Sequence, residues 1–273
     1  MKPRLALCPA LAVLLLLVAC AAPPPVALPP LRESPPPLPP PLPIRFSHGG
    51  RLLTHDILGF GPANLHIHAA IHGNEPEGIE LARRLQAELE ADPSLRRGLR
   101  VIFVNPANPD GLAAKTRYNA KGVDLNRNFP ARNWRRLAHS RLGGSGPAPL
   151  SEPETKALVE LVERYPPVLV VSLHSAAHCV NWDGPCADLA RTMAHLTGYR
   201  LAPTIGYPTP GSLGSWLGKD RGVPVITLEL HRVGPDRLWQ ENRQALLAAV
   251  RWAARREAPG IPRASRRPGS GSG

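Results

Sequence analysis

The chain has 273 residues, of which 43% are hydrophobic, and this is enough to bury the core of one sizeable α/β domain. Its formal net charge is +12, but it has no dense basic helix and no basic patch interleaved with aromatic residues. We therefore expect no nucleic-acid partner and attribute the charge to arginine-rich surface.

The N-terminus has the pattern of an export signal. A short positive head precedes an apolar run over residues 5–18, which is shorter than the roughly 20 residues of a membrane-spanning helix. The run ends on Leu-Val-Ala-Cys at residues 17–20, which resembles the bacterial lipoprotein processing box, so we expect residues 1–20 to be a signal peptide and Cys20 to carry lipid. Ala21 follows this cysteine, as in lipoproteins that are sent to the outer membrane. We therefore expect a periplasmic protein that is anchored to the outer membrane. An ordinary secretory cleavage site near residues 21–22 is the alternative.

Two further segments flank the expected domain. Residues 21–43 contain twelve prolines, a composition that favours an extended, semi-rigid linker. Residues 258–273 end in alternating glycine and serine and predict a disordered tail. The folded domain is therefore expected over residues 44–257.

Within that domain, apolar strands alternate with amphipathic helices. Because this alternation is typical of layered α/β proteins, we predict a three-layer α/β/α sandwich around a mixed, mostly parallel sheet. Ligands of such sheets bind beyond the carboxyl ends of the strands. Strands are expected at 65–71, 99–105, 168–173 and 223–230, and helices at 76–91, from Ser151, at 187–197 and at 236–256.

A histidine and a glutamate three residues apart, His72 and Glu75, follow the first of these strands. Zinc accepts both ligand types, and catalytic zinc sites use three protein ligands and one open position. Alone the pair is a weak signal, because the chain contains ten histidines. His174 and Glu229, at or near the ends of two later strands, supply further candidates.

Ordered motifs make the pair specific. They are His-Gly-Asn-Glu at 72–75, Asn-Pro-Asp-Gly at 108–111, Gly-Val-Asp-Leu-Asn-Arg-Asn-Phe at 122–129, Ser-Leu-His-Ser at 172–175, Gly-Ser-Leu-Gly-Ser-Trp at 211–216 and Thr-Leu-Glu-Leu at 227–230. Through these motifs the chain resembles, across residues 60–235, the zinc carboxypeptidase superfamily, which has the carboxypeptidase A-like fold. The resemblance implies one Zn²⁺ per chain, held by the ligands His72, Glu75 and His174.

The same resemblance implies roles for five other residues. Glu229 matches the general base, and Arg117 the arginine that stabilises the oxyanion. Asn126 and Arg127 match the pair that binds the terminal carboxylate of the substrate, a task suited to a planar guanidinium. Tyr207, four residues before Gly211, is placed like the tyrosine that caps the substrate. The alternatives are surface charge for Arg117 and a packed loop aromatic for Tyr207.

Within the superfamily, the compact length and several segments resemble the short bacterial murein peptide amidases. Those enzymes cleave the γ-D-glutamyl bond to meso-diaminopimelate in peptidoglycan-derived peptides. The resemblance implies that Asp183 meets the free amine of diaminopimelate, and a turn-forming aspartate is the alternative. The segments are residues 118–130, 151–155, 181–185 and 208–212.

Two other activities are compatible with the sequence. The enzyme could be a metallocarboxypeptidase acting on ordinary peptide C-termini, or an N-acyl amino acid deacylase of the aspartoacylase and succinylglutamate desuccinylase type. In an oxidising periplasm Cys179 and Cys186 would form a disulfide that closes a tight loop, and two free buried thiols are the alternative.

Overall fold

The computed structural model describes residues 43, 45–138 and 144–256. The expected signal peptide, the lipidation site Cys20, the C-terminal tail and all of the linker except Pro43 lie outside the described residues. Within the described part of the chain, none of the helices combines the length and the apolar character that crossing a membrane requires.

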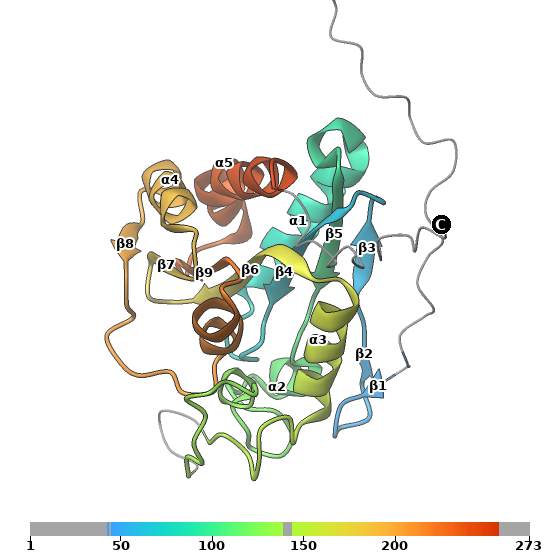
Figure 1. Ribbon diagram of the computed structural model, residues 1–273, viewed down its shortest axis with the longest axis vertical. Coiled ribbons are helices and arrows are strands. Elements are labelled where there is room, and N and C mark those ends of the chain that lie inside the picture. Colours follow the sequence, from blue (N-terminus) through green and yellow to red (C-terminus); the bar gives the residue numbers. More distant parts are fainter. Residues whose placement is uncertain (1–42, 44, 139–143, 257–273) are drawn as a thin grey trace, which may run out of the picture. The chain divides into compact units, whose positions relative to one another are not determined.

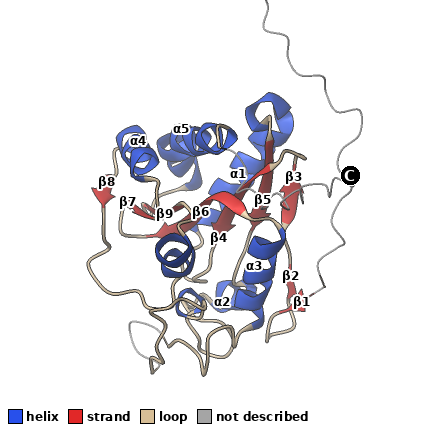
Figure 2. Ribbon diagram, in the orientation of Figure 1, coloured by secondary structure: helices blue, strands red, loops and turns tan. Residues whose placement is uncertain are grey.

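A seven-stranded sheet forms the centre of the fold, in the order β3-β5-β4-β6-β9-β7-β8 (Figures 1 and 2). The four strands from β5 to β9 run parallel to one another, β3 and β7 pair antiparallel with β5 and β9, and β8 is parallel to β7. The bounds are β3 Asp56–Leu58, β4 Ala63–Ala69, β5 Leu99–Val104, β6 Pro167–Ser175, β7 Cys179–Asp183, β8 Arg200–Ala202 and β9 Val225–Leu230. A short ribbon of β1 (Arg45–Phe46) and β2 (Leu52–Leu53) stands apart from it.

Helices cover both faces of this sheet. One core cluster joins it to α1 (Glu77–Ala91), α4 (Ala187–Thr197) and α5 (Pro235–Ala254), which lie above the sheet in Figure 1. A second cluster joins its other face to α3 (Pro153–Arg164) and the π-helical turn η3 (Gly214–Lys219). Successive residues of β5 alternate between the two clusters, as the pleat of a strand requires. The predicted three-layer α/β/α architecture with a mixed, mostly parallel sheet is confirmed.

Some boundaries differ from the sequence-based expectations. The helix expected from Ser151 starts at Pro153, and its N-cap residue Glu152 makes no side-chain cap hydrogen bond. The Ser151 hydroxyl, just before the helix, donates to the Glu152 carboxylate. The last strand begins at Val225 rather than at residue 223.

The prediction of a disulfide between Cys179 and Cys186 is wrong, because both are buried free thiols. The segment expected to be a tight loop contains the strand β7. Cys179, at one end of this strand, pairs with Glu229, whereas Cys186 lies beyond its other end against the carbonyl oxygens of Asp183 and Val225. Four residues of extended chain span about 13 Å, about twice the Cα separation that a disulfide bridges.

Candidate metal centre and active site

Two of the candidate metal ligands lie in the loop between β4 and α1, at the carboxyl end of a fully buried strand. The Glu75 amide donates to the carbonyl of His72, which makes the loop a tight turn. A Cβ on Gly73 would lie 1.8 Å from the Gly111 carbonyl carbon, so only glycine allows this close approach. Gly111 lies in the first turn of the short helix α2 (Pro109–Ala114), whose N-cap residue Asn108 donates to the Ile71 carbonyl. The Asn-Pro-Asp-Gly motif thus supports the loop that carries His72.

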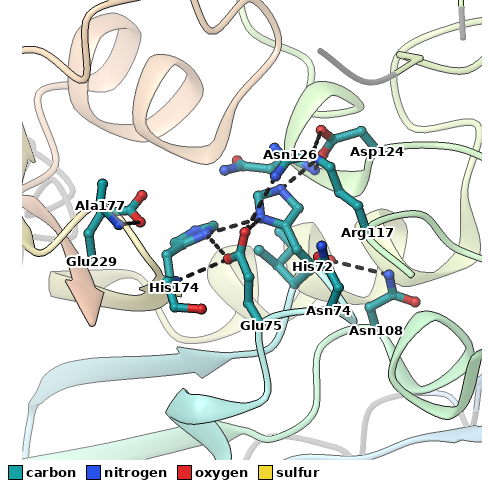
Figure 3. A network of polar contacts seen from close by, with 12 residues as sticks. His72, Asn74, Glu75, Asn108, Arg117, Asp124, Asn126, His174, Ala177 and Glu229 are labelled. Atoms are coloured by element: carbon teal, nitrogen blue, oxygen red, sulfur yellow. Dashed lines mark hydrogen bonds and ion pairs between the residues drawn. The ribbon is translucent and has the colours of Figure 1, made fainter. Parts of the chain in front are cut away.

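The third candidate ligand, His174, comes from β6, the strand next to β4 in the sheet. His72 Nδ1 and His174 Nδ1 lie 3.2 Å apart; His72 Nδ1 is 2.9 Å from Glu75 Oε1, and His174 Nδ1 is 2.9 Å from Glu75 Oε2. The three groups meet at the centre of Figure 3. All three side chains are buried. The three residues that the sequence predicted as metal ligands therefore lie close together in the folded chain.

This donor set fits zinc. Zinc bound tetrahedrally at about 2.0–2.1 Å has ligand atoms about 3.4 Å apart, within half an ångström of the three separations here. The other ring nitrogen of His72, Nε2, lies 3.2 Å from Asp124 Oδ1, which suits an N–H donated to a carboxylate while Nδ1 faces a metal. Burial would lower the pKa of His72, but the charges of Glu75 and Asp124 outweigh it and raise that pKa to about 9.

Asp124 is a residue for which the sequence assigned no role. It is completely buried at the start of the 3-10 turn η2 (Leu125–Arg127). Besides facing His72, its carboxylate accepts from the Asn126 amide at 2.9 Å and from Arg117 Nε at 2.8 Å. Burial opposes its charge, but His72 and the nearby arginines hold its pKa well below the usual range. Its position in the 122–129 motif, two residues before Asn126, was the available signal.

Arg117 extends this chain of contacts back to the metal centre. Its Nη1 lies 3.4 Å from Glu75 Oε1, and its Nε donates to Asp124 (Figure 3). Burial would lower the pKa of its guanidinium, but the charges of Asp124 and Glu75 raise it, so the group stays cationic. A fixed cation therefore stands beside the candidate ligands, as the prediction for Arg117 requires.

Glu229 reaches the same pocket from β9. Its Cα is the register partner of His174 on the adjacent parallel strand β6, so the two side chains leave the same face of the sheet. Its carboxylate accepts from the Ala177 amide at 3.4 Å (Figure 3). Glu229, His72, Glu75 and His174 all line one pocket.

The predicted substrate-binding residues line this pocket as well. The Asn126 amide oxygen accepts from the Leu213 backbone, and Arg127 donates to the Asn126 carbonyl at 2.7 Å. Arg127 is buried, which lowers its pKa, and the nearby charge of Asp124 only partly offsets this effect. Tyr207 is 45% exposed, which places it at the rim.

Asp183, the last residue of β7, also lines this pocket. One carboxylate oxygen lies 3.4 Å from the Lys219 ammonium. A Cβ on Gly214 would come within 2.1 Å of its other oxygen, so the glycine leaves room for the carboxylate. The pocket therefore holds a buried cation, Arg127, and an anion, Asp183.

Two histidines of β4, His66 and His68, take no part in the candidate metal centre. His66 Nε2 lies 2.7 Å from the Tyr165 carbonyl oxygen, and both rings are completely buried in the layer between β4 and α3. They are packing residues of this layer.

Comparison with known proteins agrees with this arrangement. Residues 59–192 match the family model described as zinc carboxypeptidase, a range that includes His72, Glu75 and His174. Murein peptide amidase A of Escherichia coli K12 is 36% identical over 195 residues, which cover 67% of this chain and 78% of the relative. The chain belongs to the zinc carboxypeptidase family. It is therefore a zinc-dependent hydrolase.

Three further proteins extend the comparison. Murein peptide amidase A of Vibrio campbellii is 31% identical over 221 residues, covering 75% of this chain and 86% of the relative. The crystal structure of a murein-tripeptide amidase from Escherichia coli O157 superposes with a TM-score of 0.61 at 32% identity, over 76% of this chain and 90% of that one. Carboxypeptidase A of Helicoverpa armigera, at 18% identity and a TM-score of 0.65 over 77% and 66% of the two chains, shares the fold.

Proposed function

We propose that this zinc hydrolase cleaves the amide bond between γ-D-glutamate and meso-diaminopimelate in peptidoglycan-derived peptides. The observation that carries the proposal is the likeness to murein peptide amidase A over 78% and 86% of two relatives, at 36% and 31% identity. The proposed reaction uses one catalytic zinc ion per chain, which His72, Glu75 and His174 would hold.

The charges of the pocket support this substrate. Diaminopimelate carries a carboxylate next to the cleaved amide, and an amine and a second carboxylate at the far end of its side chain. Arg127 and Asn126 would bind the first carboxylate, with Tyr207 closing over it from the rim. Asp183 would bind the distal amine, and Lys219, 3.4 Å from Asp183, is placed to meet the distal carboxylate.

The chemistry follows from the position of each side chain. Bound zinc supplies Lewis acidity, which lowers the pKa of water toward neutrality. The Glu229 carboxylate takes the proton of the attacking water and delivers it to the nitrogen of the leaving amino acid. The Arg117 guanidinium stabilises the negative charge that develops on the carbonyl oxygen. Asp124 keeps the proton of His72 on Nε2, so that Nδ1 faces the metal.

A panel of three substrates tests the proposal. We expect the zinc-loaded protein to release diaminopimelate from purified muropeptides and to leave an N-succinyl amino acid intact. Asp183 would also suit the lysine or arginine side chain of an ordinary peptide, so the third substrate is a peptide with a C-terminal lysine. Efficient cleavage of that peptide without muropeptide cleavage would identify a metallocarboxypeptidase, and hydrolysis of the succinyl compound alone would identify a deacylase.

The location proposed for the enzyme is the periplasm, where Cys20 would carry the lipid that anchors it to the outer membrane. The apolar run and Leu-Val-Ala-Cys at residues 17–20 support this, and the proline-rich linker would hold the domain away from the membrane. Cells expressing the full chain should incorporate labelled palmitate into it, and the Cys20→Ala variant should not. Equal labelling of both, or recovery of the unmodified protein from the cytoplasm, would contradict the proposed anchor.

A further inference from the structure

A second group of metal-ligating side chains lies beside the active site but outside its pocket. His178 follows β6, His231 is the first residue after β9, and Glu241 lies on α5. One ligand atom of each lies within 4.8 Å of the others. None of these residues has a role in the proposed reaction.

The carboxylate of Glu241 is held in place by its neighbours. Its Oε1 accepts from Arg237 Nε at 2.7 Å, and its Oε2 accepts from the Tyr199 hydroxyl at 3.2 Å. Tyr199 is itself fixed by a hydrogen bond from the Asn242 amide at 3.0 Å. Ligating carboxylates are typically oriented by such hydrogen bonds, and an oxygen that accepts one still has a free lone pair.

The two histidines lie side by side next to this carboxylate. Their rings stack, with centroids 4.5 Å apart and planes 22° from parallel. His231 Nδ1 is buried and has no hydrogen-bond partner within the described residues, and it lies 4.0 Å from Glu241 Oε2. This distance is too long for a hydrogen bond but suits two groups that face a common ion. His178 is exposed to solvent, and the edge of its ring packs against Tyr199 with the ring centroids 4.1 Å apart.

We propose that His178, His231 and Glu241 form a second binding site for a divalent transition metal ion, with zinc as the probe. Two imidazoles and one carboxylate are a donor set that zinc accepts. Tetrahedral ligation needs donor atoms about 3.4 Å apart, so the His178 ring must move inward by about 1–2 Å. Water completes the coordination, because His178 and 37% of the His231 side chain are open to solvent.

The position of the site gives it a structural consequence. His231 is two residues after Glu229, and His178 directly follows Ala177, whose amide donates to the Glu229 carboxylate. An ion held by both histidines therefore joins the two backbone segments that position Glu229.

Zinc titration of the full-length protein tests the proposal. Protein already loaded with one equivalent of zinc is titrated further in competition with a chromogenic chelator. We expect a second equivalent to bind, and His178→Gln and Glu241→Gln each to weaken it at least tenfold. The matched control is His195→Gln, because His195 is an exposed histidine of α4 outside the cluster, and its variant should bind the second equivalent as the wild type does.

Two results would overturn the proposal. One is the absence of a second equivalent in the wild type at a large excess of zinc. The other is a second equivalent whose affinity His178→Gln leaves unchanged, since that ion would lie elsewhere. Because Glu241 contacts Tyr199, its variant is compared only if its unfolding temperature matches the wild type. If it does not, His178→Gln decides, because that side chain is exposed and its replacement should leave the fold intact.

Discussion

His174 and Glu229 are register partners on the neighbouring parallel strands β6 and β9. Register partners of adjacent strands project from the same face, about 5 Å apart. The sheet therefore fixes the position of the candidate base relative to a candidate metal ligand through main-chain hydrogen bonds, without a flexible loop between them. The role of each residue can then be tested separately.

Replacement of Glu229 by glutamine should abolish turnover and leave the metal bound. The amide keeps the size of the side chain but cannot accept the proton, and positioned proton transfer contributes roughly 10²–10⁴-fold to rates. We expect kcat on the cleaved substrate to fall at least a hundredfold, while zinc content by elemental analysis stays at the wild-type value. Retained activity would show that another group is the base.

Asp124→Asn should weaken zinc binding although Asp124 is not itself a candidate ligand. The amide cannot hold His72 in the required tautomer as a carboxylate does, and losses of 10–100-fold in metal affinity are typical of such changes. A competition titration against a chelator measures the effect. Asp236→Asn is the control, because the Asp236 side chain is 83% exposed on α5. Equal affinities for the two variants would mean that the contact between Asp124 and His72 does not support the metal.

Arg127→Lys should raise KM for the proposed substrate far more than it lowers kcat. A lysine keeps the charge but loses the planar pair of donors, and a hydrogen bond to a charged group is worth about 1.5–3 kcal/mol. The expected change in KM is therefore about 10–100-fold. Arg136→Lys, at an exposed position, should leave both constants unchanged. A selective loss of kcat would place Arg127 in the chemical step instead.

The two buried cysteines should react as free thiols only after unfolding. Burial raises the pKa of Cys186 to about 12 and also raises the pKa of Cys179, so little thiolate exists in the native protein. Treatment with iodoacetamide at pH 8 without reductant should leave both peptides unmodified in native protein and alkylate both in denaturant. A peptide pair linked through sulfur would contradict the free thiols.

The stability of the fold should decrease as the pH falls from 6.5 toward 4. Burial lowers the pKa of His66 to about 4 and of His68 to about 3, whereas both titrate near 6.5 in the unfolded chain. Their stabilising contribution is thus complete above pH 6.5 and is lost as the unfolded state takes up protons.

The variant His68→Leu isolates this effect from metal release, which changes both proteins alike. Urea unfolding of wild type and variant between pH 6 and 5 should give slopes that differ by about 1.4 kcal/mol per pH unit. Parallel slopes would mean that His68 is already protonated in the folded state.

The parts of the fold predictable from sequence are those with a strong local pattern. The α4 helix was predicted with its observed bounds, since its apolar residues recur at helical spacing. The strand β7 was missed, because its five residues lack a clear alternation and it is stabilised by antiparallel pairing with β9, which is 42 or more residues away. Its absence from the prediction is also why the disulfide seemed geometrically possible.

The candidate site was also predicted only in part, namely where its residues belong to local sequence motifs. His72, Glu75 and His174 were found because they belong to recognisable motifs and because histidine and glutamate are typical metal ligands. Asp124 acts through His72, 52 residues away, and an aspartate before a turn also has an ordinary capping role, which it performs here for Asn126. Only the folded chain distinguishes these roles.

The positions of the metal ligands along the chain also set an order of events during folding. His72 and Glu75 are neighbours in the chain, but His174 lies 102 residues from His72. The complete donor set therefore exists only after β6 has docked against β4, a contact of high sequence separation that forms slowly in α/β proteins. Tight metal uptake should accompany the last cooperative step of folding, so the rate of zinc capture would report how fast the central sheet closes.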